Sequence, residues 1–222
     1  MTDLPAAGPN ATRTASTNDA ARWPSGVAIR LLRADEIELV QGLWRELLVH
    51  LDELGSAVPL VPHEQSWPRR RAAYEELLAD GRSFALGAWR DEGLIGYAMV
   101  HVAEPDPVWA TGATFVELST LSVTRRERGA GVGTALLDEV ERELTGRGID
   151  QYVIGVDSVN DGAKRFYEGR GFRVGFHLLH GHISERPAAA GGGRAAGDTA
   201  GRAEVPQRDI AETPDTAMHG EP

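Results

Sequence analysis

A glycine-rich segment between a strand pattern and a helix pattern constrains the fold of this chain more than any other feature. The apolar strand pattern ends at Val123, the glycines are Gly129, Gly131 and Gly133, and a helix pattern follows at once. Glycine lets the backbone approach a ligand closely, and the first N–H groups of a helix have no partner within it. This arrangement predicts an anion-binding turn, for which a pyrophosphate is the natural ligand.

Three alternatives to a generic pyrophosphate site can be compared with this segment. It contains no G-x-x-x-x-G-K-[ST] motif, which excludes a P-loop. A dinucleotide fold needs G-x-G-x-x-G, but the residues from Gly129 read G-A-G-V-G-T. This spacing argues against a dinucleotide-dependent oxidoreductase. Taken alone, the glycines are also compatible with a helix entry whose only role is close packing.

Charge and cysteine content narrow the function classes further. The 222 residues carry a formal net charge of −10 and contain no cysteine. The absence of cysteine excludes a disulfide scaffold, a thiolate metal site and a cysteine nucleophile. The negative charge argues against nucleic acid as a partner, because that affinity starts with phosphate neutralisation by basic side chains. The histidines show no metal-ligand spacing, so we expect no metal.

The two ends of the chain differ in composition from the middle. We expect residues 1–26 and 184–222 to be disordered, because the first has one aromatic residue and the second has none. Residues 27–183 then form one folded domain. The longest apolar run has about ten residues, too few to span a bilayer. No secretory signal stands at the start, so we expect a cytoplasmic protein without a membrane partner.

The apolar periodicity predicts alternating strands and helices within the domain. Expected strands cover 27–33, 84–89, 94–102, 114–123, 151–156 and 172–183, and expected helices cover 34–54, 67–80, 131–147 and 160–169. We expect Leu39 to share the inner face of the first helix, and Pro68 to stand near the start of the second. This order indicates an α/β (α+β) fold, with one sheet and helices on both faces.

A second motif, further along the chain, indicates what the glycine turn binds. The segment from Asn160 to Phe172 fits N-x-x-A-x-x-x-Y-x-x-x-G-F, while Arg128-Gly-Ala-Gly131-Val-Gly133 fits [RQ]-x-x-G-x-[GA]. Together and in this order, the two motifs resemble those of the GCN5-related N-acetyltransferase (GNAT) superfamily. The resemblance covers residues 27–183. It implies a mixed, mostly antiparallel sheet and acetyl-CoA as co-substrate.

The resemblance also implies a set of acetyl-CoA contacts. The pantetheine arm would pair with the strand segment before the turn, and the backbone of the turn would hold the pyrophosphate. Asn160 would hydrogen-bond the arm, and Tyr167 would reach the thioester sulfur. The implied binding residues are Leu121, Ser122, Val123, Arg128, Gly129, Ala130, Gly131, Val132, Gly133, Thr134, Asn160 and Tyr167.

Acetyl transfer to an amine needs a base and an acid. The amine must lose a proton before it attacks, and members of the family often use a glutamate on the strand that leads into the turn. Glu117 occupies that strand, where alternation places it on one face with Ser119, Leu121 and Val123. Ser119 would orient a water, and Asp157 is a second candidate base. Tyr167 would protonate the departing thiolate.

The sequence therefore predicts an acetyl-CoA-dependent N-acetyltransferase that works by direct attack. The net charge of residues 27–183, with 24 acidic and 17 basic side chains, favours a small cationic amine as acceptor. A peptide or protein amine, either an N-terminus or a lysine, is left open, as is a homodimer. A non-catalytic acyl-CoA-binding or sensing module is the alternative of a different class. His50, His63, Trp44, Trp67 and Trp109 lie near the expected acceptor pocket, with core or surface roles as their default.

Overall fold

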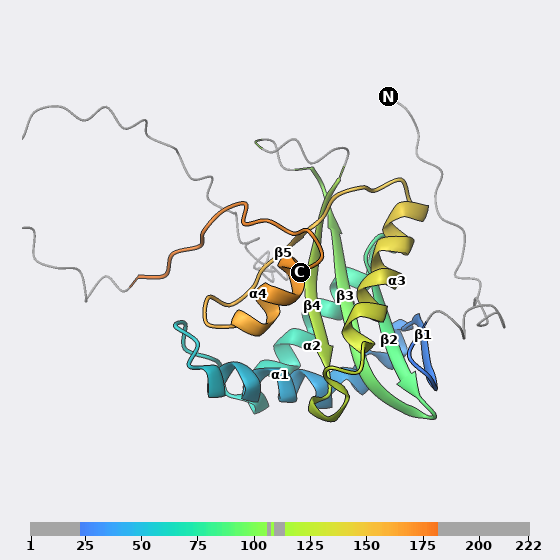
Figure 1. The fold of residues 1–222 in the computed structure, drawn as a ribbon, viewed down its shortest axis with the longest axis horizontal. Coiled ribbons are helices and arrows are strands. Elements are labelled where there is room, and N and C mark those ends of the chain that lie inside the picture. The colour runs from blue at the N-terminus through green and yellow to red at the C-terminus, as the bar shows by residue number, and fades with distance from the viewer. Residues whose placement is uncertain (1–22, 106–107, 109–113, 182–222) are drawn as a thin grey trace, which may run out of the picture. The chain divides into compact units, whose positions relative to one another are not determined.

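The computed structural model describes residues 23–105, 108 and 114–181 of the chain. Figure 1 shows the order of the elements. They are β1 (Val27–Leu31), the 3-10 helix η1 (Ala34–Val40), α1 (Gln41–Leu54), α2 (His63–Ala79), β2 (Phe84–Arg90), β3 (Gly93–Ala103), β4 (Phe115–Val123), the 3-10 helix η2 (Arg125–Glu127), α3 (Val132–Gly146), β5 (Val153–Ile154) and α4 (Asp161–Glu168).

The strands form one sheet in the order β1-β2-β3-β4-β5. The first three pairings are antiparallel and the pairing of β4 with β5 is parallel. A two-residue connection joins β2 to β3, with Asp91 at a positive φ of 53°. The predicted fold class, a mixed and mostly antiparallel sheet flanked by helices, is confirmed.

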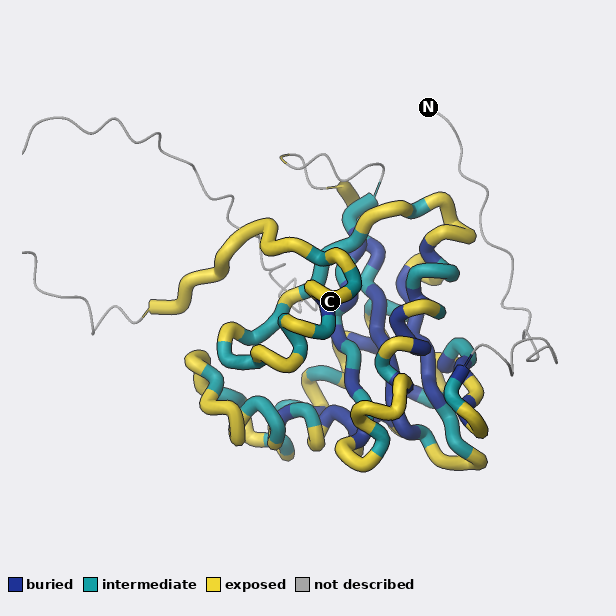
Figure 2. The backbone as a smooth tube through the Cα atoms, in the orientation of Figure 1, coloured by how far each residue is buried: buried dark blue, intermediate teal, exposed yellow. Residues whose placement is uncertain are grey.

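Each face of the sheet has its own apolar core. One core joins α3 and Tyr167 of α4 to Val100, Val116 and Leu118 of the sheet. The other joins η1, α1 and α2 to Tyr97 and Met99. Figure 2 shows that the buried backbone runs through the middle of the sheet and along the inner side of α3. The sheet thus separates the α3–α4 side from the α1–α2 side.

The two N-terminal helices differ from the prediction in their first turns. The 34–54 segment starts as η1, and its three-residue period buries Ile37 and Val40 and leaves Leu39 53% exposed. The expectation that Leu39 faces inward was therefore wrong. Helix α2 begins at His63, four residues earlier than predicted, so Pro68 lies inside it rather than at its start.

The C-terminal strands are shorter than predicted. Only Val153 and Ile154 form ladder pairs in β5, and both are half-buried rather than buried. Residues 172–181 form no strand, so the prediction of a final strand there was wrong for that part. Phe172 still packs on the core, but the apolar side chains after it, among them Phe176 and Leu178, are exposed. An alternating pattern predicts a strand only where a partner edge is within reach.

The described part of the chain begins at Trp23, four residues before the expected start of the domain. Trp23 is 8% exposed and packs into the α3-side core with Val27 and Ile29. Trp23 thus packs with the domain although the sequence placed it in the first disordered segment, and the domain boundaries stay a prediction. Residues 1–22 and 182–222 lie outside the described residues, and they include residues 184–222 and the rest of the expected disordered N-terminal segment; Trp109 lies outside the described residues as well.

A half-buried carboxylate fixes the link between β1 and η1, and it gives a testable prediction. Both guanidinium NH groups of Arg30 donate to Glu36 at 2.8 Å, and these bonds lower the pKa of Glu36 to about 2. The carboxyl of an unfolded chain has a pKa of about 4.3, so the stabilisation is complete above about pH 5 and is lost as the pH falls towards 2.

We expect Glu36→Gln to lower the free energy of unfolding by about 1–2 kcal/mol at pH 7, since Arg30 is partly exposed and solvent screens the pair. Urea unfolding at a series of pH values measures this, and the difference from wild type should shrink between about pH 5 and 3. Asp35→Asn is the control, because Asp35 is exposed and pairs only with exposed Arg33. A difference that does not change with pH would contradict the assignment.

Candidate active site

A β-bulge in β4 decides which way its side chains face. Met99 of β3 pairs with Thr120, and the next residue, Val100, pairs with Leu118, which leaves Ser119 as the extra residue. On the N-terminal side of the bulge, Leu118 packs on the α3 side, so Glu117 faces the α1–α2 side.

On the C-terminal side of the bulge, odd-numbered and even-numbered side chains have exchanged faces. Leu121 and Val123 pack on the α3 side, while the Thr120 hydroxyl bonds Tyr74 of α2 and the Ser122 hydroxyl donates to the Leu43 carbonyl of α1. The prediction that Glu117, Leu121 and Val123 share one face was therefore wrong. Glu117 shares its side with Thr120 and Ser122, because one inserted residue shifts the phase of the strand.

The two C-terminal strands of the sheet separate soon after they meet. The ladder between β4 and β5 contains only two pairs, Glu117 with Val153 and Leu118 with Ile154. From Ser119 to Val123, the β5 edge of β4 has no strand partner among the described residues. Unpaired backbone groups at such an edge can hydrogen-bond an extended ligand.

The glycine turn follows directly on this open edge. Gly129 and Gly131 have positive φ values of 78° and 84°, which side-chain-bearing residues rarely adopt. Within the described chain, the N–H groups of Gly131, Val132, Gly133 and Thr134 donate no backbone hydrogen bond, and the first such bond comes from Ala135 to the Gly131 carbonyl. The start of α3 thus offers a row of free donors to an anion.

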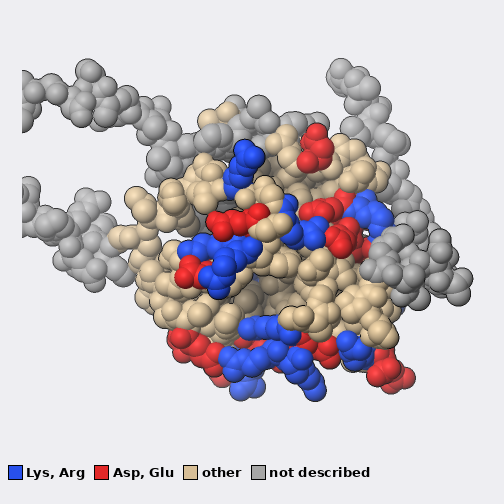
Figure 3. Space-filling model, in the orientation of Figure 1, with Lys and Arg blue, Asp and Glu red and all other residues tan. Residues whose placement is uncertain are grey.

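The arginines around the turn are not equivalent. Arg125 pairs with Glu53 of α1, and its N–H donates to Glu46. The Nε of Arg128 donates to the Val123 carbonyl at 3.1 Å, and its side chain is exposed. Figure 3 shows basic side chains gathered at the lower edge of this view, over the β4–α3 turn. Arg128 is the residue whose remaining NH groups lie open beside the free donors.

Tyr167 lies on the inner face of α4. It is 7% exposed, and its ring packs edge-on against Phe166 and Phe172 at centroid distances of 5.0 and 5.5 Å. Burial raises the pKa of its hydroxyl above the usual value of 10, so the group stays protonated at neutral pH. Among the described residues it has no hydrogen-bond partner, which leaves the proton free for a bound group.

The side chains of Asn160 and Asp157 both make hydrogen bonds that hold the fold together. The Asn160 side-chain oxygen accepts from the Ala163 N–H at 3.0 Å and caps α4, so only its NH2 group is free to donate to a ligand. Asp157 accepts from the Ser56 hydroxyl at 2.5 Å and from the Val159 N–H at 3.1 Å. These bonds tie the loop after β5 to the loop after α1 and make Asp157 a weak candidate for a base.

The remaining candidates mostly have structural positions. Trp44 and Trp67 are core residues of the α1–α2 side. His50 is half-buried at the end of α1, where burial and the neighbouring Arg128 lower its pKa. Within the described ranges no group of three or more His, Cys, Asp or Glu could hold a metal ion. The helices of that part are also too short or too polar to cross a membrane.

Sequence reasoning did not assign functions to four residues at this site. The hydroxyl of Tyr74 lies 2.6 Å from that of Thr120 and 3.3 Å from that of Tyr97, so a buried polar group joins α2 to β4 and β3. Arg70 stacks on Tyr74 from one turn earlier in α2. In the sequence, the only indication of a role for Arg70 is the run of three arginines at 69–71. The three arginines can be told apart only by their tertiary contacts.

Comparison with known proteins agrees with this geometry. The model of the acetyltransferase (GNAT) family matches residues 45–172, which include the open edge of β4, the glycine turn and α4. The chain belongs to the GNAT family. An uncharacterized N-acetyltransferase of Mycobacterium tuberculosis is 31% identical over 103 residues, which are 46% of this chain and 61% of that protein. The chain thus covers less than two thirds of this curated GNAT relative.

Solved GNAT structures share the fold at low sequence identity. A GCN5-related N-acetyltransferase from Ralstonia eutropha is 22% identical, with a TM-score of 0.58 over 71% of this chain and 99% of that one. A predicted acetyltransferase with acetyl-CoA from Clostridium acetobutylicum is 16% identical, with a TM-score of 0.57 over 72% and 98%. An aminoglycoside acetyltransferase from a soil metagenome is 17% identical, with a TM-score of 0.51 over 71% and 95%.

The positive φ of Gly131 gives a prediction for this GNAT turn. A side chain at φ 84° costs about 1–2 kcal/mol, so Gly131→Ala should strain the turn and misalign its free N–H groups. We expect the Kd for CoA to rise about 5–30-fold in calorimetry. Gly148→Ala is the matched control, because Gly148 has a φ of 74° at the far end of α3. Equal loss of affinity in both variants would contradict a role for the turn in binding.

Proposed function

We propose that this protein transfers the acetyl group of acetyl-CoA to a primary amine. The observation that carries the proposal is that two binding features follow one another along the chain, the open edge of β4 and the start of α3. The unpaired edge from Ser119 to Val123 leads, through η2, into a turn with free N–H groups. An extended, amide-containing arm with a pyrophosphate at its end complements both features.

For the turn and the edge we propose the co-substrate contacts that the sequence predicted. Leu121, Ser122 and Val123 would pair with the arm through their backbone, and the segment from Arg128 to Thr134 would hold the pyrophosphate. Asn160 would donate its free NH2 group to the arm. Gly129 supports this role, because a Cβ placed there would meet only open space and the turn is accessible from outside.

Glu117 and Tyr167 are the proposed base and acid. Glu117 would take a proton from the amine, directly or through a water, and the neutral amine would attack the thioester carbonyl. The C–N bond forms, the C–S bond breaks, and the Tyr167 hydroxyl gives its proton to the departing sulfur. The position of the Tyr167 hydroxyl supports this assignment, because the residue is buried and its hydroxyl has no hydrogen-bond partner among the described residues. The proposed transfer is direct, because the sequence contains no cysteine to carry an acetyl group and no triad pattern that would activate a serine.

The acceptor is proposed from charge. The excess of acidic side chains in residues 27–183 favours a small amine that is cationic in solution. One structural neighbour is an aminoglycoside acetyltransferase, and another is a ribosomal-protein-alanine N-acetyltransferase from Brucella melitensis. A small amine and a protein amine thus both occur among proteins of this fold, and a non-catalytic acyl-CoA sensor is the alternative function.

Calorimetry combined with thiol release separates these possibilities. We expect CoA to bind and acetyl-CoA to release thiol when a suitable amine is added. Binding of CoA without thiol release on any amine, peptide or small molecule, would favour the sensor. Failure to bind CoA at all would contradict both functions.

A further inference from the structure

A cavity of 380 Å3 lies beside α2, on the side of the sheet that Glu117 faces. Its volume falls in the range of small-molecule sites, about 300–1,000 Å3. Val61 of the preceding loop and four residues of α2 line it. The α2 residues are Ser66, Arg69, Arg70 and Ala73. The wall therefore combines small apolar groups, one hydroxyl and two guanidinium groups.

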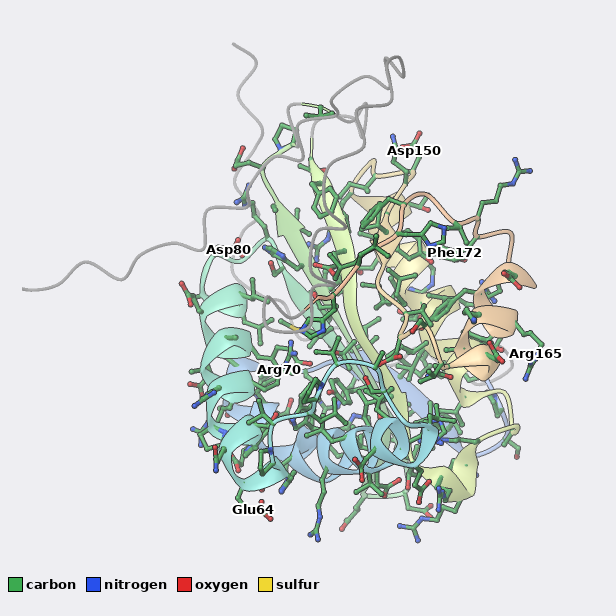
Figure 4. The ribbon with its side chains drawn as sticks, turned by 90° about the vertical axis from the view of Figure 1, so that its left-hand side faces the viewer. Glu64, Arg70, Asp80, Asp150, Arg165 and Phe172 are labelled. Atoms are coloured by element: carbon green, nitrogen blue, oxygen red, sulfur yellow. The ribbon has the colours of Figure 1, made fainter. Side chains whose placement is uncertain are left out.

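Arg70 is held in place without a carboxylate. Its Cζ atom lies 4.4 Å from the ring centroid of Trp44 and 5.5 Å from that of Tyr74. Ser66 accepts a bond from the Trp44 indole at 3.1 Å, which fixes the ring that supports Arg70. Figure 4 shows Arg70 on the side of α2 that faces the rest of the fold, unlike Glu64.

Arg70 and the next residue of α2, Arg71, differ in their ion pairs. Arg71 pairs with Glu38 at 2.7 Å and with Glu75 at 2.8 Å. No acidic side chain lies within salt-bridge distance of Arg70 in the described part of the chain. A half-buried guanidinium on a cavity wall without a carboxylate partner favours an anionic ligand.

Helix α2, which lines the cavity, packs directly on β4. Tyr74, one helical turn after Arg70, places its hydroxyl 2.6 Å from that of Thr120. Thr120 pairs with Met99, and Glu117 lies just beyond the bulge on the same side of β4. Tyr74 is fully buried and links the helix that carries Arg70 to β4, so Arg70 and Glu117 lie on the same side of the sheet.

We propose that this cavity binds the carboxylate of the acceptor, so that the acceptor is a small amino acid-like molecule. Arg70 would grip the carboxylate through its planar fork of donors, with Arg69 adding positive charge at the rim. The amine at the other end would lie towards Glu117. This inference rests on the proposed function, and it narrows the cationic amine to one that also carries an anion.

Matched pairs of amines test the inference. Thiol release from acetyl-CoA is measured with the standard L-amino acids and with the amines that remain when their α-carboxyl group is removed. We expect a carboxylate-bearing member to have the higher kcat/KM. Arg70→Met keeps a long apolar stem against Trp44, and it should raise the KM for that amino acid about 10–100-fold. The KM values for acetyl-CoA and for the decarboxylated amine should not change.

Two further variants make the result specific. Arg70→Lys keeps the charge but not the fork, and it should recover only part of the loss. Arg71→Met is the control, because Arg71 makes exposed ion pairs and does not line the cavity. Equal effects of Arg70→Met and Arg71→Met on KM would overturn the inference. Acetylation of decarboxylated amines alone would overturn it and leave the proposed function standing, whereas no acetylation of any amine would overturn both.

Discussion

Tyr167→Phe is expected to lower kcat for acetyl transfer about 100–1,000-fold and to leave the Kd for CoA within about twofold of wild type. A positioned general acid contributes about this much to a rate. The substitution removes only the hydroxyl, and the phenyl ring keeps its edge-on contacts with Phe166 and Phe172. Steady-state thiol release gives kcat, and calorimetry gives the Kd.

Tyr152→Phe is the matched control for this variant. Tyr152 also packs edge-on against Phe172, at a centroid distance of 5.2 Å, but its hydroxyl donates to Glu141 at 2.9 Å. Loss of that hydroxyl should change kcat less than about threefold, because its part-buried bond to Glu141 contributes mainly to stability. If the two variants lose activity equally, or if Tyr167→Phe keeps full activity, Tyr167 is not the acid.

Glu117→Gln is expected to lower kcat about 100–1,000-fold at neutral pH, since the amide cannot accept the proton of an ammonium group. The deficit should depend on pH. As the pH approaches the pKa of the acceptor amine, about 8–10 for α- and ε-amino groups, the amine loses its proton to solvent and the base becomes less necessary. The ratio of wild-type to variant kcat should therefore fall as the pH rises.

Asp157→Asn tests the other candidate base. Asp157 holds Ser56 and the Val159 N–H, so the variant should be less stable but should show no change in its pH profile. A constant ratio for Glu117→Gln across the pH range would assign Glu117 a positioning role. A pH-dependent deficit in Asp157→Asn, with little effect at Glu117, would transfer the role of base to Asp157.

The parts of the fold that depend on local pattern could be predicted from the sequence. Helix α3 shows this best, because its inward residues Leu136, Leu137, Val140 and Leu144 are all buried. The glycine turn was also predicted, since positive φ at Gly129 and Gly131 is a local property of the backbone. The predicted helix over 160–169 likewise matches α4 to within one residue at each end.

The parts that depend on a partner could not be predicted in this way. The bulge at Ser119 is a mismatch between β4 and β3, and no single strand shows it. It moves Glu117 to the opposite side of the sheet from Leu121 and Val123. The distinction between Arg70 and Arg71 likewise needs the positions of Trp44 and Glu38. Residues 172–181 have a strand pattern but no ladder, because alternation does not supply a partner edge.

Transfer of a labelled acetyl group tests the central claim most directly. The full chain is incubated with acetyl-CoA that carries a heavy isotope in its acetyl group, together with the amine panel, and mass spectrometry follows both products. We predict that the label appears in an amide of one amine, with one free CoA thiol for each labelled acetyl group and almost none with Tyr167→Phe. Bound CoA with no labelled amide, or thiol release that equals hydrolysis in the absence of amine, would contradict an acetyltransferase.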